Sequence, residues 1–176
     1  ASCAATGYGG GGAFVERGSS FIMLGASEIV ECTAGHGAGL LLSSDSSALI
    51  NGTARVHRNT AQLDGAGVFA INSTLRVAGA ATISQNVASR RGGGLALSHA
   101  VGELSQGCAL TQNSAVSGGC VAIEVTSTLA MRGDAALRDC TATDGGGLYS
   151  DSSEVLVNES ARVSSNVASR GGGMLI

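Results

Sequence analysis

The sequence predicts an all-β fold, a parallel β-solenoid whose coils contain about 27 residues and three short strands each. Three observations predict it: a motif recurs at a near-constant interval, apolar residues alternate with polar ones in short stretches, and small residues cluster between those stretches. No segment shows the 3.6-residue period of a helix. Proline, which would remove a backbone donor from a strand ladder, is absent from the 176 residues.

The repeat is anchored by an asparagine or cysteine that is followed two positions later by alanine. Successive anchors are 29, 27, 27, 27, 27 and 26 residues apart, which predicts about six to seven coils. Stacked about 4.8 Å apart, these coils would form a rod of roughly 30 Å. The anchors are Cys3, Cys32, Asn59, Asn86, Asn113, Cys140 and Asn166.

Each coil carries its predicted strands in a fixed order. The first strand follows a corner of small residues, as in Gly92-Gly93-Gly94-Leu95. The second contains two aliphatic residues spaced by two, such as Leu75 and Val77, and the third places an aliphatic residue three positions before the anchor, such as Ile83 before Asn86. Because residues one repeat apart lie above one another, these aliphatic columns are expected to fill a thin interior.

The asparagine anchors are predicted to form an inward structural ladder. Each side-chain amide can bind the amide of the next coil and satisfy buried turn backbone. The ladder comprises Asn59, Asn86, Asn113 and Asn166.

Two segments carry both halves of a known repeat motif. They are Ile83-Ser84-Gln85-Asn86 with Gly92-Gly93-Gly94-Leu95, and Val163-Ser164-Ser165-Asn166 with Gly171-Gly172-Gly173-Met174. These segments resemble the FxxN and GGA[ILV] repeats of chlamydial polymorphic outer membrane proteins, with Val, Ile or Leu in place of the motif Phe. The resemblance covers essentially the whole chain. It implies a right-handed parallel β-helix of the pectin-lyase-like type, located at the cell surface and used in adhesion or as a passenger stalk.

All five cysteines stand where the repeat has a small inward residue, so burial as small apolar side chains is one explanation for them. Cys3 and Cys32 occupy the same position in adjacent coils, which brings their Cα atoms within disulfide range. The alternative prediction is therefore a Cys3–Cys32 bridge, formed if the protein matures in an oxidising compartment. The odd number of cysteines leaves at least one thiol unbridged.

A metal site is not expected from the remaining candidate ligands. Cys120 and Cys140 with His99 come nearest to a metal-binding set, but they lack the close spacing of zinc ligands. His36, His57 and His99 stand at different positions in their repeats, so they do not stack into one face. We expect no cofactor.

Three asparagines outside the ladder begin N-glycosylation sequons, whereas no ladder asparagine does. They are Asn51, Asn72 and Asn158, and the first and last share one repeat position. This distribution favours a secreted eukaryotic glycoprotein.

The charged residues do not form a catalytic cluster. Asp64 and Asp144 recur at one repeat position but lie three coils apart, and Arg91 and Arg170 stand at that position one coil later. Cross-coil ion pairs of under about 1 kcal/mol explain both pairs, and the chain is not expected to be an enzyme. A net charge of −3 and scattered arginines argue against a nucleic-acid partner, and apolar runs of about five residues argue against membrane insertion.

Residues 1–176 are interpreted as a single β-helix segment of a longer solenoid. The predicted function is a non-enzymatic structural segment of an extracellular cell-surface or filament protein, which forms a rigid rod for assembly or adhesion. Its partners would be further coils of the same polypeptide, stacked copies or other chains of an assembly, and glycans. The alternative is a carbohydrate-active β-helix, lyase-like or hydrolase-like, whose catalytic coils lie outside this segment. An ice-binding or glycan-binding face would need a column of outward threonines, and none is identified in the repeat.

Overall fold

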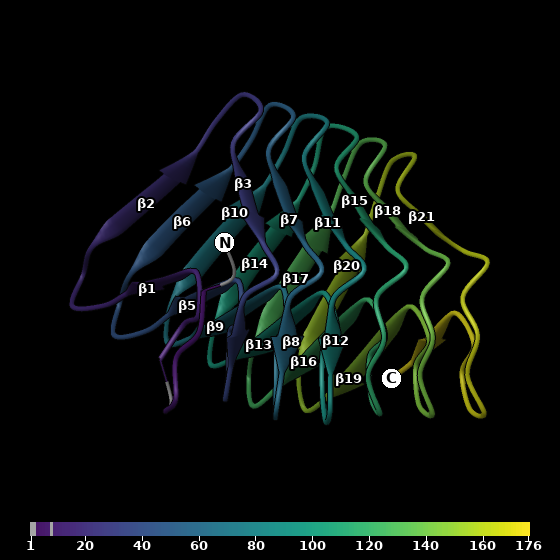
Figure 1. Cartoon of the computed structure of the whole chain (residues 1–176). Helices are drawn as coiled ribbons and strands as arrows, with labels where there is room; N and C mark the ends of the chain where they lie inside the picture. Colours follow the sequence, from purple (N-terminus) through teal and green to yellow (C-terminus); the bar gives the residue numbers. More distant parts are fainter. Residues whose placement is uncertain (1–2, 8) are drawn as a thin grey trace.

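The computed structural model describes residues 3–7 and 9–176. Within these residues the chain winds into a β-solenoid of about six turns, with parallel strands and no helix, which confirms the predicted fold class. Figure 1 shows the coils side by side along one axis, from the purple N-terminal coil to the yellow C-terminal one. Equivalent strands of successive coils pair in register, for example Thr74 with Val101 and Thr82 with Ala109.

The first strands of the coils form a seven-stranded parallel sheet, called here the first sheet. It contains β1 (Ala13–Val15), β5 (Leu40–Leu42), β9 (Val68–Ile71), β13 (Leu95–Ser98), β16 (Val121–Glu124), β19 (Leu148–Asp151) and β22 (Met174–Leu175). The second strands form the second sheet of six strands. It contains β2 (Ser20–Met23), β6 (Ser47–Ile50), β10 (Thr74–Val77), β14 (Val101–Leu104), β17 (Thr128–Met131) and β20 (Glu154–Val157).

The third sheet also has six strands and leads to the anchor position. It contains β3 (Glu28–Val30), β7 (Arg55–His57), β11 (Thr82–Ser84), β15 (Ala109–Thr111), β18 (Ala136–Arg138) and β21 (Arg162–Ser164). Beyond the three predicted strands, a two-residue strand follows the anchor in three coils and makes a small fourth sheet of β4 (Thr33–Ala34), β8 (Thr60–Ala61) and β12 (Val87–Ala88). Isolated bridges continue this column through Ser114, Thr141 and Val167.

The aliphatic columns fill the interior as expected from the alternation. Leu75, Ile83 and Leu95 from the three main sheets are fully buried in one hydrophobic core, together with their equivalents in neighbouring coils. A separate small cluster of alanines packs behind the fourth sheet. Only small side chains fit there because the chain turns sharply between the anchor and the glycine corner.

The corner needs glycine for two different reasons. Gly92 has a φ of 60°, and a Cβ atom there would lie 2.2 Å from the carbonyl oxygen of Leu95. At Gly94 the obstacle is the ladder, because an added Cβ would lie 2.8 Å from the Nδ2 atom of Asn113. The corner therefore brings the start of each coil into contact with the anchor at its end.

Candidate functional site

The asparagine column forms the predicted hydrogen-bonded ladder inside the solenoid. Asn59, Asn86 and Asn113 are at most 1% exposed. The Oδ1 atom of Asn86 accepts hydrogen bonds from the backbone N–H and the side-chain Nδ2 of Asn59, at 3.0 and 2.9 Å. Asn113 makes the same two contacts with Asn86, at 2.9 and 3.0 Å. Each amide thus serves both as a side-chain rung and as a partner for buried backbone.

The ladder also secures a strained turn in the backbone. The Nδ2 atoms of Asn86 and Asn113 donate to the carbonyl oxygens of Val56 and Ile83, three residues before the preceding anchor, at 3.1 and 2.9 Å. The residue before each anchor from Cys32 onward has a left-handed backbone, which is unfavourable for non-glycine residues. These residues are Glu31, Arg58, Gln85, Gln112, Asp139 and Ser165, with φ between 54° and 59°. Amide contacts of this kind support the turns that contain Glu31, Arg58, Gln85 and Asp139, whereas cysteine sulfur takes the place of the amide at Gln112.

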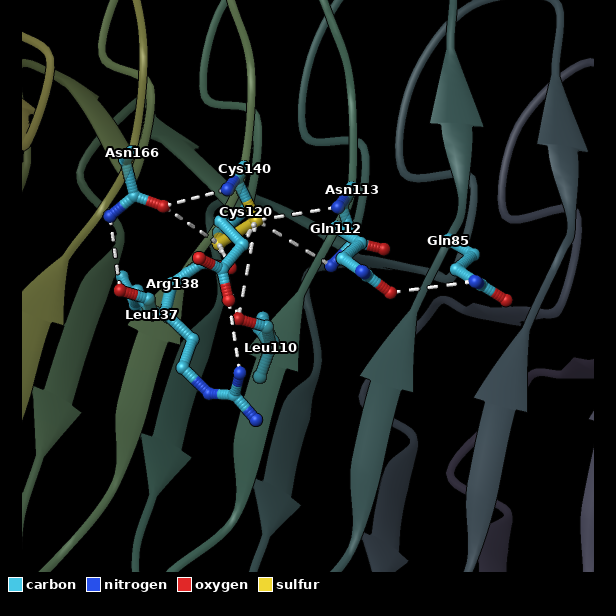
Figure 2. A network of polar contacts seen from close by, with 10 residues as sticks. Gln85, Leu110, Gln112, Asn113, Cys120, Leu137, Arg138, Cys140 and Asn166 are labelled. Atoms are coloured by element: carbon cyan, nitrogen blue, oxygen red, sulfur yellow. Dashed lines mark hydrogen bonds and ion pairs between the residues drawn. A yellow bond between two sulfur atoms is a disulfide. The ribbon is translucent and has the colours of Figure 1, made fainter.

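A disulfide interrupts the ladder. Cys120 and Cys140 are bridged, with their Cα atoms 5.5 Å apart. Figure 2 shows this bridge between Asn113 and Asn166, which lie on either side of it along the column. The backbone N–H of Cys140 donates to Oδ1 of Asn166 at 2.9 Å, whereas the backbone N–H of Asn113 finds only the Sγ atom of Cys140, at 3.4 Å. From the sequence, Cys120 and Cys140 are expected as buried small side chains or as the nearest approach to a metal-binding set, and a bridge between them is not predicted.

A signal in the sequence identifies this bridge. In neighbouring coils the third corner glycine contacts the anchor asparagine at the end of the same coil, since a Cβ on Gly147 would lie 2.7 Å from Nδ2 of Asn166. In the coil that ends at Cys140, Cys120 stands at this glycine position and Cys140 stands at this asparagine position. Replacement of both members of a contacting pair by cysteine is what a disulfide requires.

The predicted Cys3–Cys32 pair is stacked but unbridged. Ala4 pairs with Thr33, so Cys3 and Cys32 are adjacent in the column despite the 29-residue spacing of this coil. Both are free thiols in the structure, as is Cys108. Burial and the neighbouring Cys3 raise the pKa of Cys32, and burial raises the pKa of Cys108 to about 11. Oxidation of Cys3 and Cys32 to a disulfide stays a prediction.

The three sequon asparagines all lie outside the interior. Asn72 and Asn158 are exposed, and Asn72 has a left-handed backbone with φ of 46° in the turn between β9 and β10. Asn51 is half-buried, and its Oδ1 atom accepts a hydrogen bond from the backbone N–H of Gly52 at 2.7 Å. Glycosylation at these positions stays a prediction.

The three histidines have different surroundings. His36 is buried, His57 is half-buried and His99 is exposed near the hydroxyl of Thr126. Burial, followed by the charge of Arg58, lowers the pKa of His57. Among residues 3–7 and 9–176, no three His, Cys, Asp or Glu side chains are arranged to hold a metal ion.

A hollowed surface lies on the outer face of the first sheet. A groove of about 400 Å³ runs across the first five coils, between strand residues and the loop that precedes each glycine corner. Phe14, Leu41, Phe69 and Ala96 follow one another in register and form its floor. His36, Asp64, Arg90 and Glu124 contribute its polar walls.

The ion pairs of the groove differ from those expected. Asp64 is paired with Arg90, whose Nε atom donates at 2.9 Å, and not with Arg91. Arg91 does stand beside Asp64 in the column, but its side chain binds Glu124 at 2.7 Å. The reason is an additional loop residue, because five residues lie between Asn86 and Gly92 but four lie between Cys140 and Gly145 in the later coil. The second expected pair is confirmed, with Arg170 bound to Asp144 at 2.7 Å through two nitrogens.

The two carboxylates of the groove have pKa values shifted in opposite directions. Burial alone would raise the pKa of Asp64, but hydrogen bonds from His36 and Arg90 outweigh it and hold the value below its usual range. Burial raises the pKa of Glu124, and Arg91 compensates only in part. Asp64 is therefore firmly ionised, whereas Glu124 is protonated more readily than an exposed glutamate.

The fourth sheet contains a partial threonine column, which corrects the sequence analysis. Thr33, Thr60 and Thr141 are exposed and share one outward column. The column is interrupted by Val87 and Ser114 between Thr60 and Thr141. An unbroken ladder of hydroxyl groups is therefore not formed in the part of the chain that the structure describes.

Within the described residues no helix has the length and apolar character needed to cross a bilayer. Comparison with known protein families, curated proteins and solved structures finds no match.

Proposed function

We propose that this chain is a rigid structural segment of an extracellular cell-surface or filament protein, which acts in assembly or adhesion and has no catalytic role. The observation that carries the proposal is the unbroken register of the first sheet, in which seven strands from β1 to β22 pair in chain order. A stack in which every coil fixes the next resists bending, and this property suits a spacer or stalk.

The extracellular part of the proposal is supported by the Cys120–Cys140 disulfide, because disulfides form and persist in oxidising compartments. The three sequons outside the interior and the resemblance to surface-protein repeats favour the same location. Glycans on Asn72 and Asn158 would project from the solenoid without contact with the core.

The location is tested with antibodies raised against residues 1–176. We expect them to label intact cells of the producing organism without permeabilisation. Labelling that requires permeabilisation would contradict an extracellular segment.

The structural role is tested by deletion of one complete coil. Removal of residues 82–108 joins two positions that are already in register, since Thr82 pairs with Ala109. A spacer should keep its assembly or adhesion, with the reach shortened by about 4.8 Å. Complete loss of that activity by a folded, exported variant would show that this coil does more than transmit length.

The carbohydrate-active alternative draws on Asp64 and Glu124, which flank the groove with divergent pKa values. Against it, each carboxylate is held in an ion pair with an arginine, which restricts proton transfer. Incubation with acidic and neutral polysaccharides distinguishes the two functions. If the wild type produces new reducing ends or unsaturated products and Glu124→Gln does not, the structural proposal is wrong and the chain is carbohydrate-active.

A further inference from the structure

The outer face of the first sheet has an apolar file that the fold itself does not require. Phe14, Leu41, Phe69 and Ala96 alternate with inward residues, so they point away from the core that the aliphatic columns already fill. The corresponding file of the third sheet begins with the ion-paired Glu28 and Arg55. A file of outward apolar residues that is flanked by charged loops is typical of a binding surface.

The groove over this file has the size of a small-molecule site. Its volume of about 400 Å³ is within the range of roughly 300–1,000 Å³ typical of ligand pockets. Phe14 is 49% exposed, so part of its ring is accessible to a ligand. The small side chain of Ala96 leaves room one coil beyond the ring of Phe69.

The floor favours a flat ring. The imidazole of His36 already lies against Phe69, with the ring centroids 5.2 Å apart and the planes inclined by 23°. Phe14 stands two coils away from Phe69, about 10 Å along the axis, with Leu41 between them. Offset stacking and apolar contact with such a surface favour planar aromatic groups.

The walls favour a ligand without net charge. Asp64 is ion-paired with Arg90, and Glu124 with Arg91. A charged ligand would have to compete with one of these pairs or lie beside a group of the same sign. The hydroxyl residues Ser43 and Ser98 line the edge of the groove at the carboxyl ends of the strands, where Ser98 pairs with Glu124 of the next coil, and they can bind a polar substituent of the ligand.

We propose that this groove binds an uncharged planar aromatic molecule of one or two rings that carries a hydroxyl or similar polar substituent. The rings rest on the file formed by Phe14, Leu41 and Phe69 and extend over Ala96. The substituent faces Ser43 and Ser98. This site is independent of the proposed structural role.

The test is a titration of the full chain with 2-naphthol, followed by ligand fluorescence and by saturation-transfer NMR. We expect saturable binding of one molecule per chain. Ala96→Leu fills the groove and should weaken binding at least about tenfold. The matched control is Ala109→Leu, a half-buried outward alanine on the third sheet, which should leave binding unchanged.

Urea unfolding of each variant shows whether it is folded. Should Ala96→Leu fail to fold, Phe14→Ala provides the same test, because this half-exposed ring contributes little to the core. Non-saturable binding to the wild type, or equal binding by the wild type and the folded groove variant, would overturn the proposal. Tighter binding of naphthalene-2-sulfonate or of an oligosaccharide than of 2-naphthol would overturn the ligand class.

Discussion

The coils around Asn86 and the coil closed by Cys120 and Cys140 solve the same problem with different chemistry. Around Asn86, side-chain amides join each coil to the next by hydrogen bonds. The disulfide instead joins the beginning and the end of a single coil, and it replaces an amide rung with the sulfur of Cys140. Coupling between neighbouring coils and closure of a single coil are therefore separate functions. The anchor position provides the first when it is asparagine and the second when it is cysteine.

The largest expected effect comes from breaking the ladder at its centre. Asn86→Leu removes the acceptor of Asn59 and the donor to Val56, so buried polar groups lose their partners. We expect a loss of at least about 3 kcal/mol in the free energy of unfolding, measured in urea. The control is Val87→Leu, which changes the adjacent exposed residue. An unchanged urea midpoint for Asn86→Leu would mean that the ladder does not stabilise the fold.

The second effect concerns the disulfide. Cys120→Ala with Cys140→Ala should lower the free energy of unfolding by about 2–4 kcal/mol, since the bridge closes a loop of about 20 residues. Cys120→Gly with Cys140→Asn also removes the bridge but restores the contact pair of the other coils. This second variant should be more stable than the first. Equal stability of the two would show that an amide at this position adds nothing to the neighbouring rungs.

A smaller effect is expected from the buried ion pair of Asp64. Its folded-state pKa lies below the unfolded value of about 3.9, so its ionised form stabilises the fold above that value. This stabilisation is lost as the pH falls through the folded-state pKa. The difference in urea midpoint between the wild type and Asp64→Asn should therefore shrink between about pH 5 and pH 2. A difference that is independent of pH would contradict this assignment.

The smallest effect is expected at the exposed equivalent of that pair. Hydrogen bonds from Arg170 lower the pKa of Asp144, but the Arg170 side chain is 71% exposed, and solvent and salt screen the pair. We expect no measurable change in the urea midpoint for Asp144→Asn at neutral pH. A loss comparable to that of Asp64→Asn would show that burial is not what distinguishes the two aspartates.

The fold could be predicted from the sequence because each position of the repeat recurs in six or seven coils. A single Asn86 is uninformative, but the recurrence of asparagine at Asn59 and Asn113 fixes the register and the inward direction together. The disulfide could not be found by comparing equivalent positions, since it joins two different positions of one coil.

The groove was harder to predict for two physical reasons. Phe14 and Phe69 are apolar, and so are their inward-facing neighbours in the same strands. The sequence pattern therefore does not tell whether these two residues face the core or the solvent. The partner of Asp64 was assigned to Arg91 because these two residues align in the repeat. In this longer loop two arginines, Arg90 and Arg91, precede the corner, and the alignment of the repeats does not decide which side chain reaches Asp64.

The loop before the glycine corner is where the repeat length varies, with four residues between anchor and corner in some coils and five in others. The register of the first sheet is unaffected, because strands that follow loops of different length still pair directly, as Leu41 does with Phe69 and Ala96 with Ala122. Insertions and deletions at this point therefore change the rim of the groove without disturbing the core. Evolution can diversify recognition here as it does in the hypervariable loops of binding scaffolds, and a library randomised at this loop would be a direct route to new specificities.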